Sequence, residues 1–431
     1  MKLKTISHRL SKYLILIQYY LGLVNRTNSN AIFSFLFRLF RWCTNTRVDI
    51  HNIVLPLFWM DESTSCEKGI LCPNSTGIAY GPHYIGRVQS TERVRLPDVH
   101  YHAFHKARIC GTSSSVILNE KQVIIDRAKG PDQEFYDFAT GHVLMHGADM
   151  AIVRLGKPAH IKNGIFLGGN GSSNYYHWIV EILAKLEFLS MLPKNYQQYP
   201  LLVSDSVMFT PSFKFSLDLF AKGSEIIVLK KEVPYAVDEL IYINSPNNLP
   251  FNLLGNQQFK SSYVTINSRS IFFLRKIVLE NAFKMPACSI FSKKIFLCRK
   301  GKLRNYNQDE IFNYLSMFGY TKVFMEDLSF LDQVLTAHHA DYIVGPTGAA
   351  WTNLIFCRPR TKALCWMAAE FNDFSAYSSI AHQVGVDLKY LTYMAGVHST
   401  SKLHYKDYTI DLSMIERGLS ELDKTFRQPC D

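Results

Sequence analysis

Hydrophobic positions along this 431-residue chain gather into short apolar runs separated by longer segments with helical spacing. The runs at 165–167, 200–203, 225–229, 239–243 and 294–297 have the length of buried strands, and they alternate with helix-like segments. Such alternation is typical of parallel sheets that helices cover on both faces. The pattern therefore predicts an α/β fold.

The first half of the chain carries a second kind of pattern. After a loop-like region at about 61–82, the residues become β-rich, and 115–126 predict a hairpin that turns at 119–122. From Gly164 the pattern changes to a strand at 165–167, a glycine-rich loop at 168–174 and a helix over 175–192. The helix thus begins where a glycine-rich loop ends.

The first fifty residues differ from the rest. Two apolar segments, 13–24 and 31–42, have basic residues around them, and the first falls short of the ~20 residues needed to cross a bilayer. They favour docking on an anionic membrane surface. Two alternatives stay open, which are a helical extension packed on its own domain and a type II membrane anchor.

The formal charge of +11 favours an anionic partner, which is nucleic acid, a lipid head group or a phosphorylated small substrate. Nucleic acid is the least favoured of these, because the basic residues are scattered and no nucleic-acid-binding motif is present. The nine cysteines lie singly without a CxxC pair, which indicates reduced thiols and neither a zinc site nor a disulfide framework.

A glycine turn lies within 328–356, where the pattern reads as helix, buried strand, turn and second helix. Gly345 and Gly348 bracket the turn; glycine permits positive φ and close backbone approach, and free N–H groups at a helix start attract phosphate. The hypothesis is an anion site. The alternative is an ordinary strand-to-helix turn.

The predicted helix after Gly171 carries a polar face. At about 100° per residue, Asn174, His177, Glu181 and Lys185 fall on one side. Glu181 or His177 could serve there as a general base at the mouth of a cleft. The alternative is a solvated face on which Glu181 and Lys185 form an exposed ion pair.

A basic loop follows the predicted strand at 294–297. Arg299, Lys300, Lys302 and Arg304 come at its carboxyl end, which is the edge where ligands bind in open α/β sheets. These side chains could pair with a diphosphate. The alternative is a solvated basic loop.

Three stretches together resemble glycosyltransferase family 61. They are NYYHWIVE at 174–181, CRK at 298–300 with Arg304 and Asn307 downstream, and SFLDQV at 329–334 followed by IVGPTGAAWTN at 343–353. The residues at 96–99 and 111–118, and a late helix that begins near 411, are also similar to that family. The resemblance covers roughly 96–422.

The resemblance implies a GT-B architecture, with two Rossmann-like domains facing across a cleft. We expect a basic amphipathic extension at 1–60, an acceptor-side domain with a β-rich start at 61–270, a nucleotide-sugar-binding domain at 271–395 and a helical tail at 396–431. The resemblance also implies an inverting transfer of a hexosyl or pentosyl group from a nucleoside-diphosphate sugar, with no cofactor and no metal.

The site residues expected on this basis divide into three groups. Glu181 is the first choice of base and His177 the second. Donor binding is assigned to Arg299, Lys300, Arg304, Gly345, Thr347, Gly348, Thr352, Asn353 and Glu370, and the acceptor-side loop to Asn170 and Asn174.

Two positions depart from the family's pattern. Thr347 stands where the family commonly has His, and Cys365 where it often has a Glu that could hold a sugar or ribose hydroxyl; Glu370 is the nearby substitute. An altered donor or a lapsed activity would follow from these changes. The alternative function is therefore an inactive GT-B scaffold that binds a glycan or a partner enzyme.

The expected partners are a nucleotide-sugar donor and a saccharide, lipid-linked or protein hydroxyl acceptor, with peripheral membrane contact and no nucleic acid. The expected setting is surface polysaccharide or glycoconjugate synthesis, such as capsular polysaccharide, on the cytoplasmic side of a bacterial membrane. The eukaryotic secretory pathway is the alternative, in which Asn25, Asn74 and Asn170 would be potential glycan acceptors.

Overall fold

The computed structural model describes residues 52–63, 67–126, 136–231, 233–254, 257–284, 291–301 and 303–424. Most of the extension predicted at 1–60, including both of its apolar segments, lies outside these residues, as does Lys302. Within the part that the structure describes, no helix combines the length and the apolar character that a membrane crossing requires.

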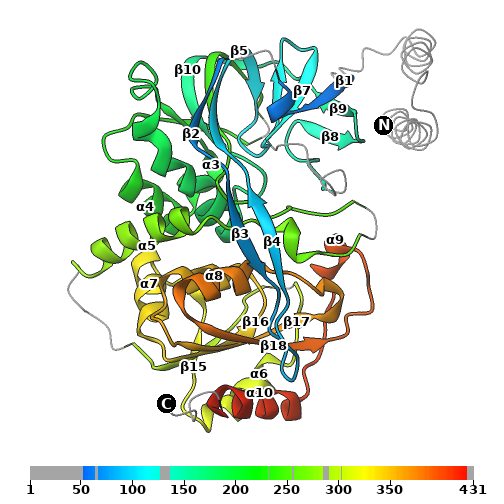
Figure 1. Ribbon diagram of the computed structural model, residues 1–431, viewed down its shortest axis with the longest axis vertical. Coiled ribbons are helices and arrows are strands. Elements are labelled where there is room, and N and C mark those ends of the chain that lie inside the picture. Colours follow the sequence, from blue (N-terminus) through cyan, green and yellow to red (C-terminus); the bar gives the residue numbers. More distant parts are fainter. Residues whose placement is uncertain are drawn as a thin grey trace, which may run out of the picture.

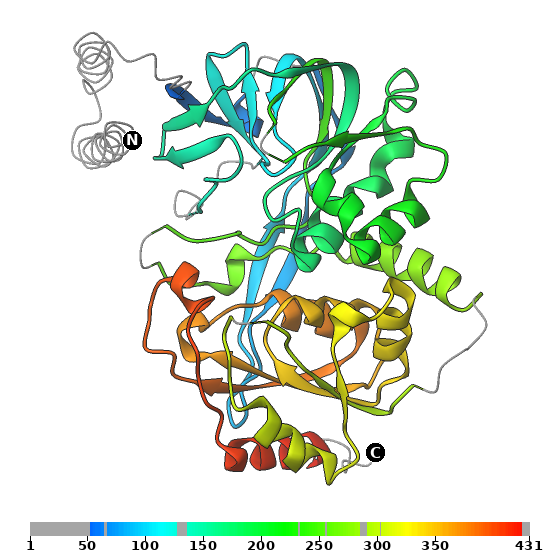
Figure 2. The same ribbon diagram turned by 180° about the vertical axis from the view of Figure 1, so that it is seen from behind.

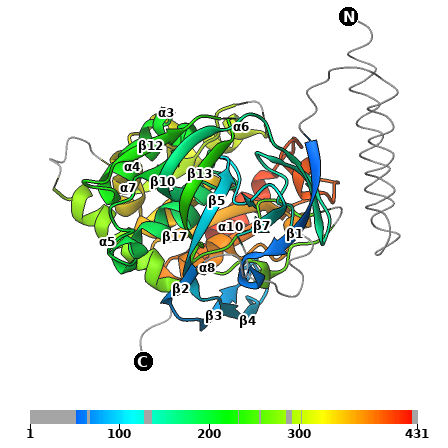
Figure 3. The same ribbon diagram turned by 90° about the horizontal axis from the view of Figure 1, so that it is seen from above.

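The larger sheet has eleven strands in the order β12-β11-β10-β13-β5-β6-β7-β1-β9-β8, with β2 paired to β5 (Figures 1 and 3). Its strands are β1 Asn52–Trp59, β2 Glu67–Cys72, β5 Val99–Ile109, β6 Val116–Leu118, β7 Gln122–Ile125, β8 Val143–His146, β9 Met150–Arg154, β10 Ala159–Leu167, β11 Leu201–Ser204, β12 Ile226–Leu229 and β13 Tyr235–Ile243.

This sheet is parallel in only part of its width. Strands β12, β11, β10 and β13 run parallel to one another, but β13 pairs with β5 antiparallel. The runs for which the sequence predicts parallel strands in this sheet, at 165–167, 200–203, 225–229 and 239–243, are therefore confirmed as parallel, and the antiparallel pairs involve the β-rich first part of the chain. The hairpin predicted at 115–126 is confirmed, because β6 and β7 pair antiparallel on either side of the turn.

The smaller sheet has five strands in the order β15-β14-β16-β17-β18, and every pair in it is parallel. Its strands are β14 Lys294–Leu297, β15 Thr321–Val323, β16 Tyr342–Pro346, β17 Lys362–Ala368 and β18 Asp387–Tyr393. All seven residues of β17 are buried, as expected of a parallel strand covered on both faces. The predicted α/β fold is confirmed.

Helices lie between the two sheets and also on the outer face of the smaller sheet (Figure 2). Those that follow strands of the larger sheet are η3 His177–Ile182, η4 Leu183–Met191, α3 Asp205–Phe209, α4 Pro211–Phe220 and α5 Ser268–Ala282, with short η1 Met60–Glu62 and η5 Ser261–Tyr263. Those of the smaller sheet are α6 Gln308–Ser316, η6 Met325–Asp327, α7 Phe330–His339, η7 Ala349–Phe356, η8 Ala369–Phe371, α8 Ala376–Val384, α9 Thr400–Leu403 and α10 Leu412–Lys424.

One hydrophobic core runs through this helical layer into both sheets. It includes Ile165 of β10, Leu274 of α5, Val334 of α7 and Ile343 of β16. A separate cluster under α6 and α10 covers the other face of the smaller sheet. The boundary predicted between residues 270 and 271 falls inside α5, and the division into domains stays a prediction.

A long hairpin also connects the two halves. Its strands are β3 Ser75–Tyr80 and β4 Thr91–Leu96, and Figure 1 shows them reaching from the larger sheet down to the smaller one. The ring of Tyr80 stacks on His382 of α8 at 3.6 Å between centroids, and Tyr84 forms a parallel bridge to Tyr390 of β18. The hairpin therefore adds an attachment outside the shared core.

Candidate functional site

A buried pair of titratable side chains lies at the start of the helical layer. The Nδ1 atom of His177 is 2.5 Å from Oε2 of Glu181, and the amide of Leu249 donates to Oε1 of the same carboxylate at 2.6 Å. Each of the two residues is only 6% exposed. The alternative of a solvated face is therefore wrong.

The backbone here is not the regular α-helix that the spacing predicts. His177–Ile182 is a π-helix and Leu183–Met191 a 3-10 helix, so the 175–192 segment is helical but changes its winding beside the pair. π-Helical turns occur frequently at functional sites. Lys185 does not extend into solvent either: its Nζ lies 3.8 Å from Oδ2 of Asp126, and both side chains are 4% exposed.

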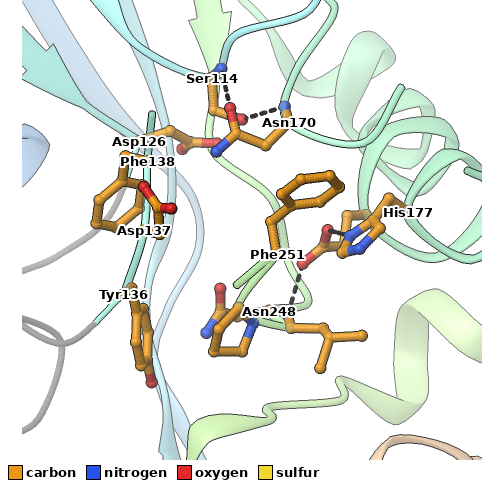
Figure 4. Close-up of a pocket in the computed structure, with 12 residues that line it drawn as sticks. Ser114, Asp126, Tyr136, Asp137, Phe138, Asn170, His177, Asn248 and Phe251 are labelled. Carbon is orange, nitrogen blue, oxygen red and sulfur yellow. Dashed lines mark hydrogen bonds and ion pairs between the residues drawn. The ribbon is translucent and has the colours of Figure 1, made fainter. Parts of the chain in front are cut away.

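The loop before the π-helix holds His177 in place. Gly171 has φ +73°, and a Cβ there would lie 2.7 Å from Cδ2 of the His177 ring, so glycine meets both a backbone and a packing requirement. Asn170 fixes the loop through two hydrogen bonds of 2.9 Å to Ser114 (Figure 4). Its side-chain oxygen accepts from the backbone N–H of Ser114, and its backbone N–H donates to Ser114 Oγ. Asn174 is exposed and accepts from the amide of Tyr176 at 2.9 Å.

The glycine turn lies at the carboxyl end of β16, where the sequence predicts it. Both glycines are required because neighbouring atoms approach the backbone closely, and not because of a left-handed conformation. Gly348 is extended with φ 167°, and Gly345 has no positive φ. A Cβ on Gly345 would lie 2.7 Å from Cβ of Leu297, and one on Gly348 would lie 2.9 Å from Nη2 of Arg299. The helix that follows, η7, is a 3-10 helix.

The two arginines of the basic loop have different positions. Arg299 lies behind the turn, where Nη2 donates to the carbonyl oxygen of Thr347. Arg304 faces the cavity described below, and no hydrogen bond or ion pair within the described residues involves its guanidinium. Its φ of +55° is in the left-handed region, a conformation that costs an arginine roughly 1–2 kcal/mol.

Burial, followed by the nearby charge of Arg299, lowers the pKa of Arg304 to about 10. The two guanidinium groups therefore form a cationic centre that has lost part of its hydration. An anionic group bound there would offset both the lost hydration and the repulsion between the two positive charges.

A cavity of about 400 Å³ lies between the two halves of the molecule. His177 and Asn174 line it from one side, and Arg304, Thr347 and Gly348 line it from the other. Glu181 does not line this cavity but lines a second, smaller one of about 20 Å³, and His177 lines both. Figure 4 shows His177 at the smaller cavity. The structure thus brings His177 and Arg304 to one cavity and places Glu181 and Arg299 behind them.

The other predicted site residues lie outside this lining. The Lys300 ammonium pairs with Asp327, and the Glu370 carboxylate accepts from the amides of Ala395 and Gly396 at 3.1 and 2.6 Å. Thr352 is fully buried, and its hydroxyl has no hydrogen-bond partner among the described residues. The carbonyl oxygen of the Asn353 side chain accepts from the Tyr175 hydroxyl at 2.9 Å, which links the two halves.

The two residues that depart from the family's pattern are neighbours in space. Cys365 of β17 is fully buried and paired in register with Gly345, and its thiol interacts with the side chain of Thr347. Burial raises the pKa of this thiol, so it stays protonated at neutral pH. The five cysteines within the described residues are all free thiols, as predicted.

Several lining residues carry no sequence motif. They are Phe251, which follows β13, and Phe374, Tyr377, His404 and Tyr405, which come from around α8 and α9. Loss of surrounding water, followed by the charges of Arg304 and Arg299, lowers the pKa of His404 to about 4, so its imidazole is neutral at pH 7. The one sequence signal for these aromatic lining residues is the aromatic content of 13%.

Within the described part of the chain, no group of three or more His, Cys, Asp or Glu side chains is arranged to hold a metal ion. The positive groups at the cavity are instead Arg304 and the arginine behind it. The amides of Gly348 and Ala349 come at the start of η7, where backbone N–H groups lack helical acceptors.

An α/β protein with a buried histidine–carboxylate pair and a cationic centre at one cavity has the features of a group-transfer enzyme. The family model described as Glycosyltransferase 61 matches residues 175–364 of the chain, which is less than half of its length. This match supports assigning the chain to glycosyltransferase family 61, and with it glycosyltransferase activity. No curated protein matches the chain. The matched segment contains His177, Glu181, both arginines and the glycine turn.

Proposed function

We propose that the protein transfers a sugar from a nucleoside-diphosphate sugar to a hydroxyl acceptor with inversion at the anomeric carbon. The observation that carries this proposal is the shared cavity, which His177 lines from one side and Arg304 from the other. The two halves then correspond to the acceptor-side and donor-side domains of a GT-B enzyme.

His177 acts as the base in this proposal, and Glu181 orients it. An ionised carboxylate only accepts hydrogen bonds, so Nδ1 of His177 carries the proton toward Glu181 and Nε2 presents a lone pair. Nε2 takes the proton of the acceptor hydroxyl as the oxygen attacks the anomeric carbon. Glu181 then stabilises the imidazolium that forms.

The leaving group takes up negative charge as the bond between the anomeric carbon and the diphosphate oxygen breaks. Arg304 and the amides that begin η7 are the groups placed to receive that charge. Arg299 supports them by holding the carbonyl of Thr347. Because these groups supply the electrostatic stabilisation, the proposed reaction uses no cofactor and no metal ion.

Calorimetry with a panel of nucleoside diphosphates tests the donor site. We expect the wild-type protein to bind at least one of them and Arg304→Ala to weaken that binding tenfold or more, because a charge-assisted contact is worth about 1.5–3 kcal/mol. Arg154→Ala is the control, since Arg154 is exposed at the end of β9. Lack of binding to every diphosphate in the panel would refute the donor site.

Release of nucleoside diphosphate from a panel of nucleotide-sugars identifies the donor. A protein that binds a diphosphate but neither hydrolyses nor transfers any sugar would instead be the inactive scaffold.

The proposed biological role is synthesis of a surface polysaccharide or glycoconjugate on the cytoplasmic side of a bacterial membrane, with peripheral contact through the basic extension. Fractionation of cells that express the full chain, with and without residues 1–51, checks this location.

A further inference from the structure

The wall of the cavity between His177 and Arg304 is mostly apolar. Phe251 contributes to it from the segment after β13, and Phe371, Phe374 and Tyr377 contribute from the other half. The ring of Phe251 is adjacent to the proposed base, with its centroid 5.4 Å from that of His177. Any acceptor hydroxyl that reaches His177 therefore lies beside an aromatic surface.

Large apolar groups are also exposed at this cavity. Phe251 is 38% exposed, Leu303 is 55% exposed and Tyr405 is 70% exposed, and they come from both sides of the cavity. Covering such surface gains about 25 cal/mol for each Å² of apolar area removed from water. Single exposed apolar residues are ordinary, but three at one cavity with a titratable pair indicate a ligand contact.

The charges of the lining residues restrict the chemical class of the acceptor. Among the described residues that line the cavity, none is acidic, and Arg304 is the fixed cation. Sugar hydroxyls are hydrogen-bond donors, and burying them without acceptors costs about 1–3 kcal/mol each. The acceptor atoms that a polyhydroxylated acceptor would need are on scattered neutral side chains such as Asn174, Asn252 and Thr347, whereas an alkyl or aryl group needs no such partner.

We propose that the acceptor carries an apolar alkyl or aryl group next to the hydroxyl that receives the sugar, and that Phe251, Leu303 and Tyr405 hold this group. The acceptor class is thus an apolar alcohol or a glycoside with an apolar aglycone, and not an unsubstituted hydrophilic saccharide. The role of this surface as an acceptor site rests on the proposed transferase function.

A pair of simple glycosides tests the apolar surface directly. Octyl β-D-glucopyranoside and methyl β-D-glucopyranoside differ only in the alkyl group, and both are titrated into the full-length protein below the concentration at which the octyl compound forms micelles. We expect the octyl compound to bind at least tenfold more tightly. Equal affinities would overturn the proposal and indicate that the aromatic wall stacks on sugar rings.

Matched variants locate the binding. Phe251→Ser is expected to reduce the octyl preference to less than threefold, and Phe251→Leu to retain most of it. Phe272→Ser is the control, because Phe272 is 48% exposed on α5 and does not line the cavity. If Phe251→Ser does not fold, Leu303→Ser replaces it. An octyl preference that survives the serine substitution in the folded variant would overturn the proposal.

The result is separable from the donor test. If the wild-type protein binds no nucleoside diphosphate, the proposed transferase function is refuted. An octyl preference that depends on Phe251 would still establish the apolar site. Conversely, diphosphate binding without an octyl preference would leave the transferase function intact and overturn the apolar acceptor.

Discussion

At the scale of single residues, each side of the cavity pairs a residue that lines it with a partner behind it. Glu181 stands behind His177, and Arg299 stands behind Thr347. The partner fixes the orientation of the lining residue, which a substrate then meets already positioned. The sequence favoured Glu181 as base, but only His177 lines the larger cavity.

This arrangement predicts different effects for two substitutions. His177→Ala is expected to lower kcat for transfer by about 10²–10⁴-fold, the usual contribution of a general base, while the Kd for nucleoside diphosphate changes little. Glu181→Gln keeps the shape but leaves one carbonyl oxygen for the two donors that Glu181 serves, so we expect a loss of kcat no larger than that of His177→Ala. Steady-state kinetics and calorimetry measure the two quantities.

Thermal unfolding of both variants serves as the control for folding, because Glu181 also accepts from the amide of Leu249. A larger kcat loss for Glu181→Gln than for His177→Ala would contradict the assignment. Glu181 itself would then be the base.

At the scale of elements, the glycine turn shows how two similar residues meet different constraints. A Cβ on Gly345 would lie 2.9 Å from the carbonyl oxygen of Leu297, which belongs to the neighbouring strand β14. A Cβ on Gly348 would instead meet the end of the Arg299 side chain. Backbone in a sheet cannot move aside cheaply, whereas a guanidinium can rotate away.

We therefore expect Gly345→Ala to lower the free energy of unfolding by about 1–3 kcal/mol, because the two strands must separate. Gly348→Ala is expected to leave the stability nearly unchanged and to weaken nucleoside-diphosphate binding, since it displaces Arg299 from the turn. Chemical denaturation and calorimetry on both variants make the comparison. Equal loss of stability in both would show that Arg299 cannot move away.

The sequence predicted most elements and the positions of several site residues, but not how they are wound or assembled. Apolar runs identified β10, β14 and the hairpin of β6 and β7. They could not distinguish a π-helix from an α-helix at His177–Ile182, because the periods are close and tertiary packing decides between them. Phe251 and His404 were missed because they lie outside helices and strands and reach the cavity only through the tertiary fold.

At the scale of the whole molecule, folding buries imidazoles in the larger sheet as well as at the cavity. His102 of β5 is 2% exposed, and burial, with the nearby charges of His100 and Lys68, lowers its pKa to about 3. His142, before β8, is 5% exposed, and burial lowers its pKa to about 4. Both side chains are therefore neutral in the folded protein at pH 7.

Protonation of these histidines is linked to unfolding. Their pKa in an unfolded chain is near 6.5, so between that pH and about 4 the unfolded state binds more protons than the folded state. Stability is full above pH 6.5 and falls as the pH decreases through this window. The two pKa values correspond to a loss of about 2 kcal/mol for each histidine at pH 5.

The difference in unfolding free energy between pH 7 and pH 5 tests this linkage, because the direct packing cost of a substitution appears at both pH values and cancels. His102→Phe is expected to shrink the difference by about 2 kcal/mol, since the site no longer titrates. Phe104→Leu is the matched control: its ring stacks on His102 at 5.7 Å, so the substitution disturbs the same packing but removes no titrating group. If both variants keep the wild-type difference, protonation of His102 does not contribute to acid unfolding, and other groups account for the loss of stability.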